Sequence, residues 1–415
     1  MGFKINHVAQ KLKIAFLTSI YPKHAEEIYE QHPELSKKSS YEQMEFIRWH
    51  ALSSYVRWFE LLEEKGYQTC SFNHNLPDVA LAWAKENRFQ TKTSNRIMEI
   101  GKEKIIRFKP DIIFCFAPPS YLSNNYLHEI VVSLVNKPKL IAWYGANIGD
   151  EKIFNFFDLT LSNSKHLVKR LRNKGIKSDF LGHSFDPIIL KKIEIPSKRI
   201  NRVSFFGNLD LTTRDFNERT RLLEKVFDET GKLDVYGQFS IFSNQQRIKY
   251  KILESRSNLC RIVNKVLPIN KVGYWANPSN LPTPPLALSR NFERKIKKPL
   301  YGHGMLGKLS SYKIALNYHN QHTGDNACNM RLFEATGVGC ALLTDYKSDL
   351  SDYFEDETEV YSYKNIQELN EKLAYLCNNP LDAELIGNNA KKRVLKSHNI
   401  FIQIEIVSDY IRNVA

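Results

Sequence analysis

The stretch that decides the fold is Asn326-Ala-Cys-Asn-Met-Arg-Leu-Phe-Glu-Ala-Thr-Gly-Val-Gly-Cys-Ala-Leu-Leu-Thr-Asp345. It combines a polar loop, a short helical segment, two glycines and an apolar run with the length of a buried strand. A loop that enters a helix leaves backbone N–H groups free to bind an anion such as phosphate. The stretch therefore predicts one unit of an α/β domain with a phosphate-binding turn.

Two charged side chains on the expected helix have complementary chemistry. Arg331 is a planar cation suited to phosphate oxygens, and Glu334 is a carboxylate suited to the paired hydroxyls of a ribose. Because residues three apart share a helix face, both could bind one nucleoside diphosphate. The diphosphate would then lie over Cys328, Asn329 and Met330. The alternative interpretation is a surface ion pair, which is common and weak.

Apolar runs and helical patterns alternate on both sides of this stretch. Strand-like runs occur at 13–18, 112–116, 139–143 and 159–162, and apolar residues at helical spacing cover 41–66. Alternation of this kind is typical of parallel strands joined by crossover helices. The sequence therefore predicts an α/β fold with Rossmann-like domains.

The alternation stops and restarts in the middle of the chain. Asp186-Pro187 and Pro196-Ser197 interrupt it, and a strand-like run at 203–206 begins a second series. We therefore expect the following segments: an N-terminal Rossmann-like domain over 1–185, a linker at 186–200, a C-terminal Rossmann-like domain over 201–395 with an insert at 240–300, and a final helix at 396–415 that packs back on the N-terminal domain.

The insert carries most of the excess positive charge. The chain has a formal charge of +14, and residues 241–300 contain twelve Lys and Arg against two acids. A localised basic surface attracts polyanions, which include anionic lipid headgroups, phosphorylated glycans and nucleic acids. The alternative is a solvated basic face that only keeps the protein soluble.

Hydrophobic runs, cysteine spacing and acidic motifs indicate where the protein is located and whether it needs a metal. No apolar run approaches the roughly 20 residues of a membrane-spanning helix, and the N-terminus lacks the apolar core of a secretion signal. We therefore expect a cytoplasmic protein. The six cysteines do not have metal-site spacing, and no Asp-x-Asp pair occurs. We expect that no metal or other cofactor is required.

Residues 309–398 resemble the group 1 family of retaining glycosyltransferases, and in particular the branch named after a spore maturation protein. The family helix has the pattern R-x-F-E-A-x-x-x-G-x-x-x-L-x-D. Here it is Arg331-Leu-Phe-Glu334-Ala335, followed by Gly339, Leu343 and Asp345. The N-terminal half is similar to the family only in its alternation of strands and helices.

The resemblance implies the GT-B fold, in which two Rossmann-like domains face each other across a cleft. The sugar-nucleotide donor would bind to the C-terminal domain and the acceptor to the N-terminal one, with the ribose on Glu334. Many family members have a second Glu eight residues earlier, facing the donor sugar. This chain has Asn326 there, so we take Asn326 as a catalytic candidate together with Arg331.

The resemblance also implies contacts at two glycine turns of the C-terminal domain. The diphosphate would approach the backbone at Gly207 and Asn208, with Arg214 as an added positive charge. The nucleotide base would lie near Tyr236 and Gly237.

His183 is the last catalytic candidate. It stands in the segment Phe180-Leu-Gly-His-Ser-Phe-Asp186, just before the domain break, where it should face the cleft. It could serve as a base, a sugar contact or a capping group, and His319 has the same three possible roles.

Together these features predict transfer of a sugar, with retention, from a nucleoside diphosphate sugar to a glycan or lipid-linked acceptor, in the assembly of a bacterial surface polysaccharide. The insert at 240–300 would contact the anionic inner surface of the membrane. One alternative is a sugar-nucleotide epimerase or non-catalytic relative of the same fold, which the Asn326 departure favours. Another is a basic nucleic-acid-binding protein, although the insert lacks a recognisable nucleic-acid motif, and we expect no nucleic-acid partner.

Overall fold

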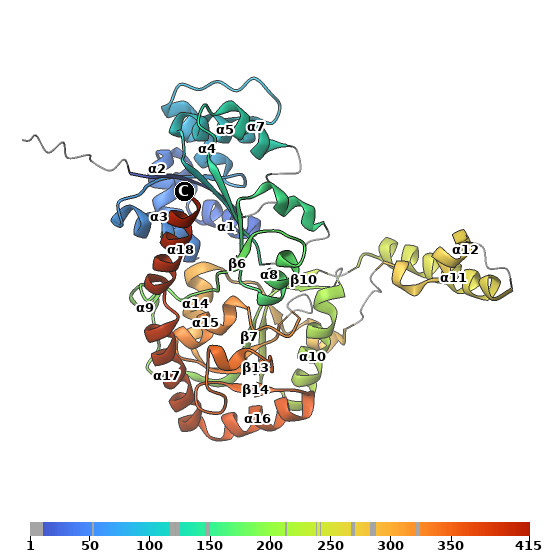
Figure 1. Cartoon of the computed structure of the whole chain (residues 1–415). Helices are drawn as coiled ribbons and strands as arrows, with labels where there is room; N and C mark the ends of the chain where they lie inside the picture. The colour runs from blue at the N-terminus through green and yellow to red at the C-terminus, as the bar shows by residue number, and fades with distance from the viewer. Residues whose placement is uncertain are drawn as a thin grey trace, which may run out of the picture.

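The computed structural model describes residues 11–51, 54–116, 121, 125–145, 150–211, 214–237, 239–240, 242–266, 270–282, 288–319 and 324–415. Within these residues, two six-stranded parallel sheets form the centres of two α/β units, which lie one above the other in Figure 1. A two-stranded pair, β8 with β10, lies beside the second sheet. The predicted α/β fold class is confirmed.

The first sheet has the strand order β2-β1-β3-β4-β5-β6. Residues 14–17 of the inner strand β1 are fully buried, which explains why this strand is a continuous apolar run instead of an alternating one. The strands are β1 (Lys13–Thr18), β2 (Gln68–Asn73), β3 (Ile112–Cys115), β4 (Lys139–Trp143), β5 (Leu159–Ser162) and β6 (Ser178–Phe180).

The second sheet has the order β11-β9-β7-β12-β13-β14. Counted along the chain, this is the order 3-2-1-4-5-6 of a Rossmann domain, which binds ligands where the order reverses, between β7 and β12. The strands are β7 (Ile200–Phe206), β9 (Leu233–Tyr236), β11 (Ile296–Lys297), β12 (Tyr312–Asn317), β13 (Ala341–Asp345) and β14 (Tyr361–Tyr363), with β8 (Leu209–Asp210) and β10 (Phe239–Ser240) in the separate pair.

Helices cover both sheets, and hydrophobic clusters fill the space on each face. The first unit contains α1 (Pro22–Gln31), α2 (Ser40–Ala51), α3 (Ser54–Glu64), α4 (Pro77–Glu86), α5 (Arg96–Phe108), α7 (Tyr126–Ser133) and α8 (Lys165–Arg172). The rest of the chain contains α9 (Ile189–Lys192), α10 (Arg214–Thr230), α11 (Asn244–Val266), α12 (Asn270–Ala276), α13 (Arg290–Glu293), α14 (Gly302–Ser310), α15 (Met330–Gly337), α16 (Ile366–Asn378), α17 (Pro380–Ser397) and α18 (Ile400–Val414).

The last helix crosses to the first unit. α17 lies along the second sheet, and α18 continues upward to α3, as the red end of the chain shows in Figure 1. Trp58 Nε1 donates a hydrogen bond to Gln403 Oε1 at 3.0 Å, and Ile404 and Ile411 share a hydrophobic cluster with Phe16. The C-terminal helix therefore ties the two units together.

Two elements differ from the expectations. The helical pattern over 41–66 corresponds to two helices, α2 and α3, with residues 52–53 outside the described part. The basic insert contains a long helix, α11, followed by α12, and both extend away from the body of the protein (Figure 1). The strands predicted at 139–143 and 159–162 are confirmed with the same bounds.

Candidate active site

The candidate site lies at the carboxyl edge of the second sheet, around the start of α15. β7 ends at Phe206 and β12 at Asn317, and these strands flank the position where the strand order reverses. α15 follows β12, and its first turn carries Met330 and Arg331. The predicted phosphate-binding turn therefore occupies the place where Rossmann-like sheets bind ligands.

Arg331 and Glu334 lie on one face of α15, as predicted, and form an ion pair with each other. Arg331 Nη1 lies 2.8 Å from Glu334 Oε2, and the two side chains are only 17% and 16% exposed. Arg331 Nη1 also lies 2.9 Å from the sulfur of Met305, and the guanidinium carbon lies 5.8 Å from the centre of the Phe206 ring. This pair is thus fixed by surrounding protein, unlike the exposed pair of the alternative interpretation.

The loop before α15 is held by buried amides. The carbonyl of Cys328 accepts a hydrogen bond from Asn163 Nδ2 at 2.8 Å. Asn329 Nδ2 donates to Asn317 Oδ1 and to the carbonyl of Tyr318, each at 3.1 Å. Burial raises the pKa of the Cys328 thiol to about 12, so this cysteine is not a thiolate nucleophile at neutral pH.

Asn326 links the two units. Its Oδ1 accepts a hydrogen bond from the backbone N–H of His166 at 2.6 Å, and its Nδ2 donates to Asp349 Oδ2 at 3.2 Å. His166 lies in the first turn of α8, which begins after the N-cap residue Ser164. The predicted catalytic residue therefore already has partners for both polar atoms and acts in this structure as a contact between the units.

His183 is joined to the same loop through Asn163. Asn163 Nδ2 lies 2.8 Å from His183 Nε2, and it also contacts the carbonyl of Cys328. Burial lowers the pKa of His183 to about 4, so the imidazole is neutral at pH 7. Gly145 is required beside this amide, because a Cβ there would lie 2.2 Å from Asn163 Oδ1. No motif in the sequence marks Asn163, which is distinguished only by its position after a strand.

His319 forms a buried pair with Asp345. His319 Nδ1 lies 2.7 Å from Asp345 Oδ1, and the backbone N–H of His319 donates to the same oxygen at 2.8 Å. Burial alone would raise the pKa of Asp345, but the hydrogen bonds and charge of His319 lower it. The carboxylate therefore stays ionised and orients the histidine ring.

Three buried polar atoms around the start of α15 have no hydrogen-bond partner among the described residues. They are Asn163 Oδ1, His319 Nε2 and Arg331 Nε. Leaving a buried polar atom unsatisfied costs about 1–3 kcal/mol, so such atoms need a reason. A polar ligand in the site would supply the missing partners.

The two glycine turns approach each other closely. A Cβ on Gly237 would lie 2.3 Å from the carbonyl oxygen of Gly207, so the second turn has no room for a side chain. The carbonyl of Asn208, an exposed residue, accepts a hydrogen bond from Arg219. Arg219 is a buried cation that the sequence analysis missed, and burial lowers its pKa to about 10. The side chain of Arg214 lies outside the described residues.

Tyr236 is part of the core. Its ring stacks on Phe206 with centroids 4.6 Å apart, and its hydroxyl lies 3.1 Å from that of Tyr312. The ring is buried in the cluster beneath the second sheet. The predicted contact of Tyr236 with a nucleotide base stays a prediction.

The first unit also contributes residues to the boundary. Lys165 lies 3.5 Å from Asp349 and forms a second ion pair with Asp352. Tyr21, the N-cap residue of α1, is exposed, and the centre of its ring lies 6.0 Å from that of Tyr301.

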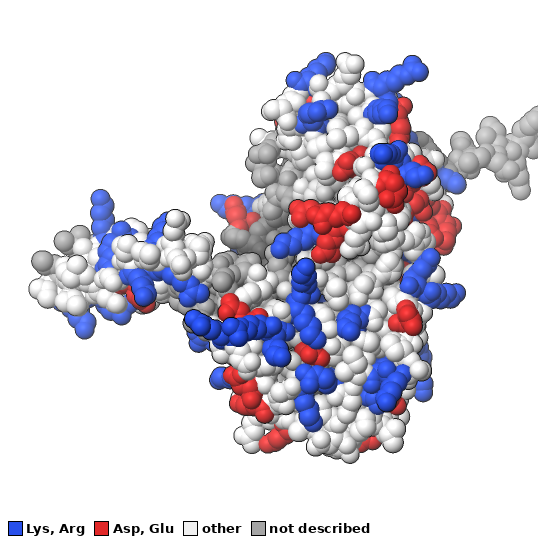
Figure 2. Space-filling model, turned by 180° about the vertical axis from the view of Figure 1, so that it is seen from behind, with Lys and Arg blue, Asp and Glu red and all other residues white. Residues whose placement is uncertain are grey.

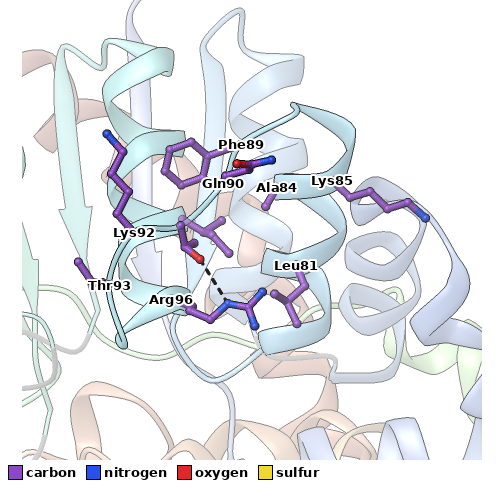
Figure 3. A pocket seen from close by; sticks show the side chains of 10 residues that line it. Leu81, Ala84, Lys85, Phe89, Gln90, Lys92, Thr93 and Arg96 are labelled. Atoms are coloured by element: carbon purple, nitrogen blue, oxygen red, sulfur yellow. Dashed lines mark hydrogen bonds between the residues drawn. The ribbon is translucent and has the colours of Figure 1, made fainter.

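A separate pocket of about 610 Å³ lies on the first unit, between α4 and α5 (Figure 3). Lys85, Lys92 and Arg96 line it beside Phe89, and Arg96 Nε donates to Thr91 Oγ1 at 3.3 Å. None of the predicted site residues lines this pocket.

No group of three or more His, Cys, Asp or Glu side chains suited to a metal ion occurs in the part of the chain that the structure describes. The expectation that no metal is required stays a prediction. Among the same residues, no helix is both long and apolar enough to span a membrane.

Comparison with known structures identifies the fold. Sucrose-phosphate synthase from Thermosynechococcus elongatus matches with a TM-score of 0.54 at 10% identity, over 97% of this chain and 99% of that one. HepE of Anabaena, solved with UDP and glucose, matches with 0.53 at 10% identity over 97% and 100%. An α-glucosyltransferase solved with UDP-glucose and DNA containing an abasic site matches with 0.57 at 10% identity over 97% and 100%. The chain therefore has the GT-B fold.

The sequence comparison finds one family match, in the second half of the chain. Residues 256–402 match the protein family described as "Glycosyl transferase-like", and this segment contains the whole candidate helix α15. No curated protein sequence matches the chain significantly. The predicted class, an enzyme of the glycosyltransferase type with the GT-B fold, is confirmed; the proposed branch within it stays a prediction.

Proposed function

We propose that the protein transfers a sugar, with retention of configuration, from a nucleoside diphosphate sugar to a glycan or lipid-linked acceptor in the assembly of a bacterial surface polysaccharide. The reaction would take place in the cytoplasm, at the inner face of the membrane. The observation that carries the proposal is the set of three unpartnered buried polar atoms beside the Arg331–Glu334 pair, at the ligand-binding edge of a GT-B donor domain.

The proposal assigns the donor to the second unit. The diphosphate would lie over the first turn of α15, where Arg331 and backbone N–H groups offset its charge. Glu334 would accept hydrogen bonds from the ribose hydroxyls. Structures with UDP or UDP-glucose among the GT-B proteins named above favour a uridine nucleotide as the first ligand to test.

During transfer, the bond from the sugar to the diphosphate breaks and the acceptor hydroxyl oxygen forms the new bond to the same carbon. The hydroxyl proton would pass to the departing diphosphate. The neutral His183 and the unpartnered Oδ1 of Asn163 are suited to hydrogen bonds with sugar hydroxyls, because a neutral imidazole can donate and accept and an amide oxygen can accept. These residues would orient the substrates, and Arg331 would stabilise the charge that develops on the leaving group.

One observation favours a second candidate function. Asn326 stands where many family members have a carboxylate that faces the sugar, and both of its polar atoms already have partners, His166 of the first unit and Asp349 of the second. A sugar-nucleotide epimerase or non-catalytic relative could accept this loss more easily than a transferase. We therefore keep it as the alternative.

A turnover assay separates the two. UDP-, GDP- and dTDP-sugars are incubated with the protein, with and without a bacterial membrane fraction that supplies lipid-linked glycans, and products are identified by mass spectrometry and NMR. Transfer predicts nucleoside diphosphate release that depends on the acceptor. An epimerised sugar nucleotide without acceptor product would support the alternative. Arg331→Gln should abolish turnover, whereas Arg412→Gln, in an exposed Arg–Asp pair with the same spacing, should not.

A further inference from the structure

α11 and α12 form a helical arm within the insert at 240–300, which takes no part in binding the donor as proposed above. The arm leaves the body after β9 and β10 and extends away from both units (Figure 1). Its base is the β8–β10 pair, which follows the glycine turns at Gly207 and Gly237. The arm is therefore attached at the edge of the second sheet that carries the candidate donor site.

One face of α11 is an exposed stripe of aliphatic side chains. The stripe is 37–77% exposed and its spacing of 3, 4 and 7 residues places all members on one side of the helix. It consists of Ile248, Ile252, Leu259, Ile262, Val263 and Val266. Six large aliphatic side chains on one exposed helix face exceed the scattered apolar residues of an ordinary surface.

The opposite face of α11 is already occupied by α12. Ser257 is buried there, and a Cβ on Gly273 of α12 would lie 3.5 Å from Asn264 Oδ1. The guanidinium carbon of Arg256 lies 3.6 Å from the centre of the Trp275 ring. Packing within the arm thus leaves the stripe on the outside.

Basic side chains border the stripe on both sides. At 100° per residue, Arg247, Lys251 and Lys265 fall on one side of it and Lys249 and Arg256 on the other. From 244 to 276 the arm has seven Lys and Arg and one acid, Glu254. Figure 2 shows this concentration of Lys and Arg on the arm.

We propose that the arm is a peripheral membrane anchor that binds a bilayer surface rich in anionic lipids. α11 lies parallel to the surface, with the aliphatic stripe at the boundary of the acyl chains and the flanking Lys and Arg at the phosphates. Long basic side chains on the borders of an apolar face reach the headgroups in this orientation. The proposal deepens the proposed function and rests on it, because a lipid-linked acceptor would then meet the donor site close to the membrane.

Charge and hydrophobicity together favour a bilayer over the two other possible partners of the arm, a second copy of the chain and a nucleic acid. Two copies packed stripe against stripe would bring two positively charged arms together, which is unfavourable. A nucleic acid would use the cations but would leave the aliphatic stripe in water. An anionic bilayer satisfies both the cations and the stripe.

The test is co-sedimentation of the full chain with vesicles of phosphatidylcholine alone and vesicles of equal parts phosphatidylcholine and phosphatidylglycerol. The wild type should bind only the anionic vesicles, and NaCl should weaken the binding. Ile252→Ser with Ile262→Ser should weaken it about tenfold or more, because the apolar contact is lost. Each Lys→Gln change at Lys249 and Lys251 should weaken it about fivefold.

Leu381→Ser is the matched control, since Leu381 is an exposed aliphatic residue of α17 away from the arm, and it should leave binding unchanged. Stripe variants that bind anionic vesicles as tightly as wild type would overturn the proposal. A wild type that is a dimer by light scattering, together with a stripe variant that is a monomer, would also overturn it. DNA binding that is tighter than vesicle binding and unchanged in the stripe variant would do the same.

A UDP thermal-shift measurement keeps this proposal separate from the proposed function. The stripe variant should keep the stabilisation by UDP seen in the wild type, which also shows that it is folded. If UDP has no effect on either protein but the wild type still binds anionic vesicles, the donor assignment fails and the anchor stands. If UDP stabilises both and neither binds vesicles, the anchor fails alone.

Discussion

Asn326 Oδ1 accepts a hydrogen bond from the backbone N–H of His166 at 2.6 Å, and this bond joins the loop before α15 to the first turn of α8. Its other amide atom donates to Asp349, which also receives the N–H of Ala327 at 2.6 Å. The residue that departs from the family pattern therefore helps to set the distance between the two units.

The contact predicts that a carboxylate is not tolerated at this position. Asn326→Asp keeps the acceptor for His166 but places a second carboxylate about 3 Å from Asp349 and removes a donor. We expect the free energy of unfolding to fall by about 1–3 kcal/mol, measured by urea denaturation. Asn365→Asp is the control, because the Asn365 amide also bonds to a backbone N–H and to a carboxylate, both of Glu368, but in solvent. An equal loss in both variants would contradict this explanation.

The close approach of the two glycine turns predicts a specific effect of a methyl group. Gly237→Ala should lower the free energy of unfolding by about 1–3 kcal/mol and weaken nucleotide binding, because its Cβ would meet the Gly207 carbonyl at 2.3 Å. Gly304→Ala has no atom within 4 Å and lies in a helix, so it should be neutral or slightly stabilising. Thermal unfolding with and without UDP measures both effects.

A histidine cluster between α1, α2 and α14 predicts loss of stability in acid. Burial, together with the charges of His303 and His50, lowers the pKa of His24 to about 4 from 6.5. The unfolded chain therefore binds more protons between these values, and stability present above pH 6.5 is lost as the pH falls towards 4, by up to about 3 kcal/mol for this group.

The check is the melting temperature between pH 7 and pH 4.5. His24→Phe keeps an aromatic ring against Tyr301, 5.4 Å away, but cannot bind a proton, so its melting temperature should depend less on pH. The exposed His128→Gln should follow the wild type. A His24→Phe profile that is parallel to the wild type would show that another group causes the acid sensitivity.

The sequence predicted what depends on local patterns. Continuous apolar runs predicted the buried parallel strands, and the spacing of Arg331 and Glu334 predicted that they share one face of α15. Both follow from periodicity and side-chain chemistry alone. The exposed stripe of α11 has the same kind of signal, but only the structure shows that no other element covers it in the described part of the chain.

Contacts between the units could not be predicted. Asn163 and Cys328 are 165 residues apart, and nothing in either segment indicates that they meet. The same is true of Lys165 and Asp349. For Tyr236 the sequence pattern was ambiguous, because an aromatic residue at a strand end can be either a ligand contact or a core residue. Its stacking on Phe206 shows that it belongs to the core.

The most direct test of the donor site is calorimetric and thermal-shift titration of UDP, GDP, dTDP, CDP and ADP against wild type, Glu334→Gln and the control Asp409→Asn, which changes the exposed pair with Arg412. Binding to the native state raises its melting temperature. We expect one nucleotide to stabilise the wild type and the control, and Glu334→Gln to bind it about tenfold or more weakly, because a hydrogen bond to a charged group is lost. No stabilisation by any of the five, or equal affinity in Glu334→Gln, would contradict a donor site at Arg331 and Glu334.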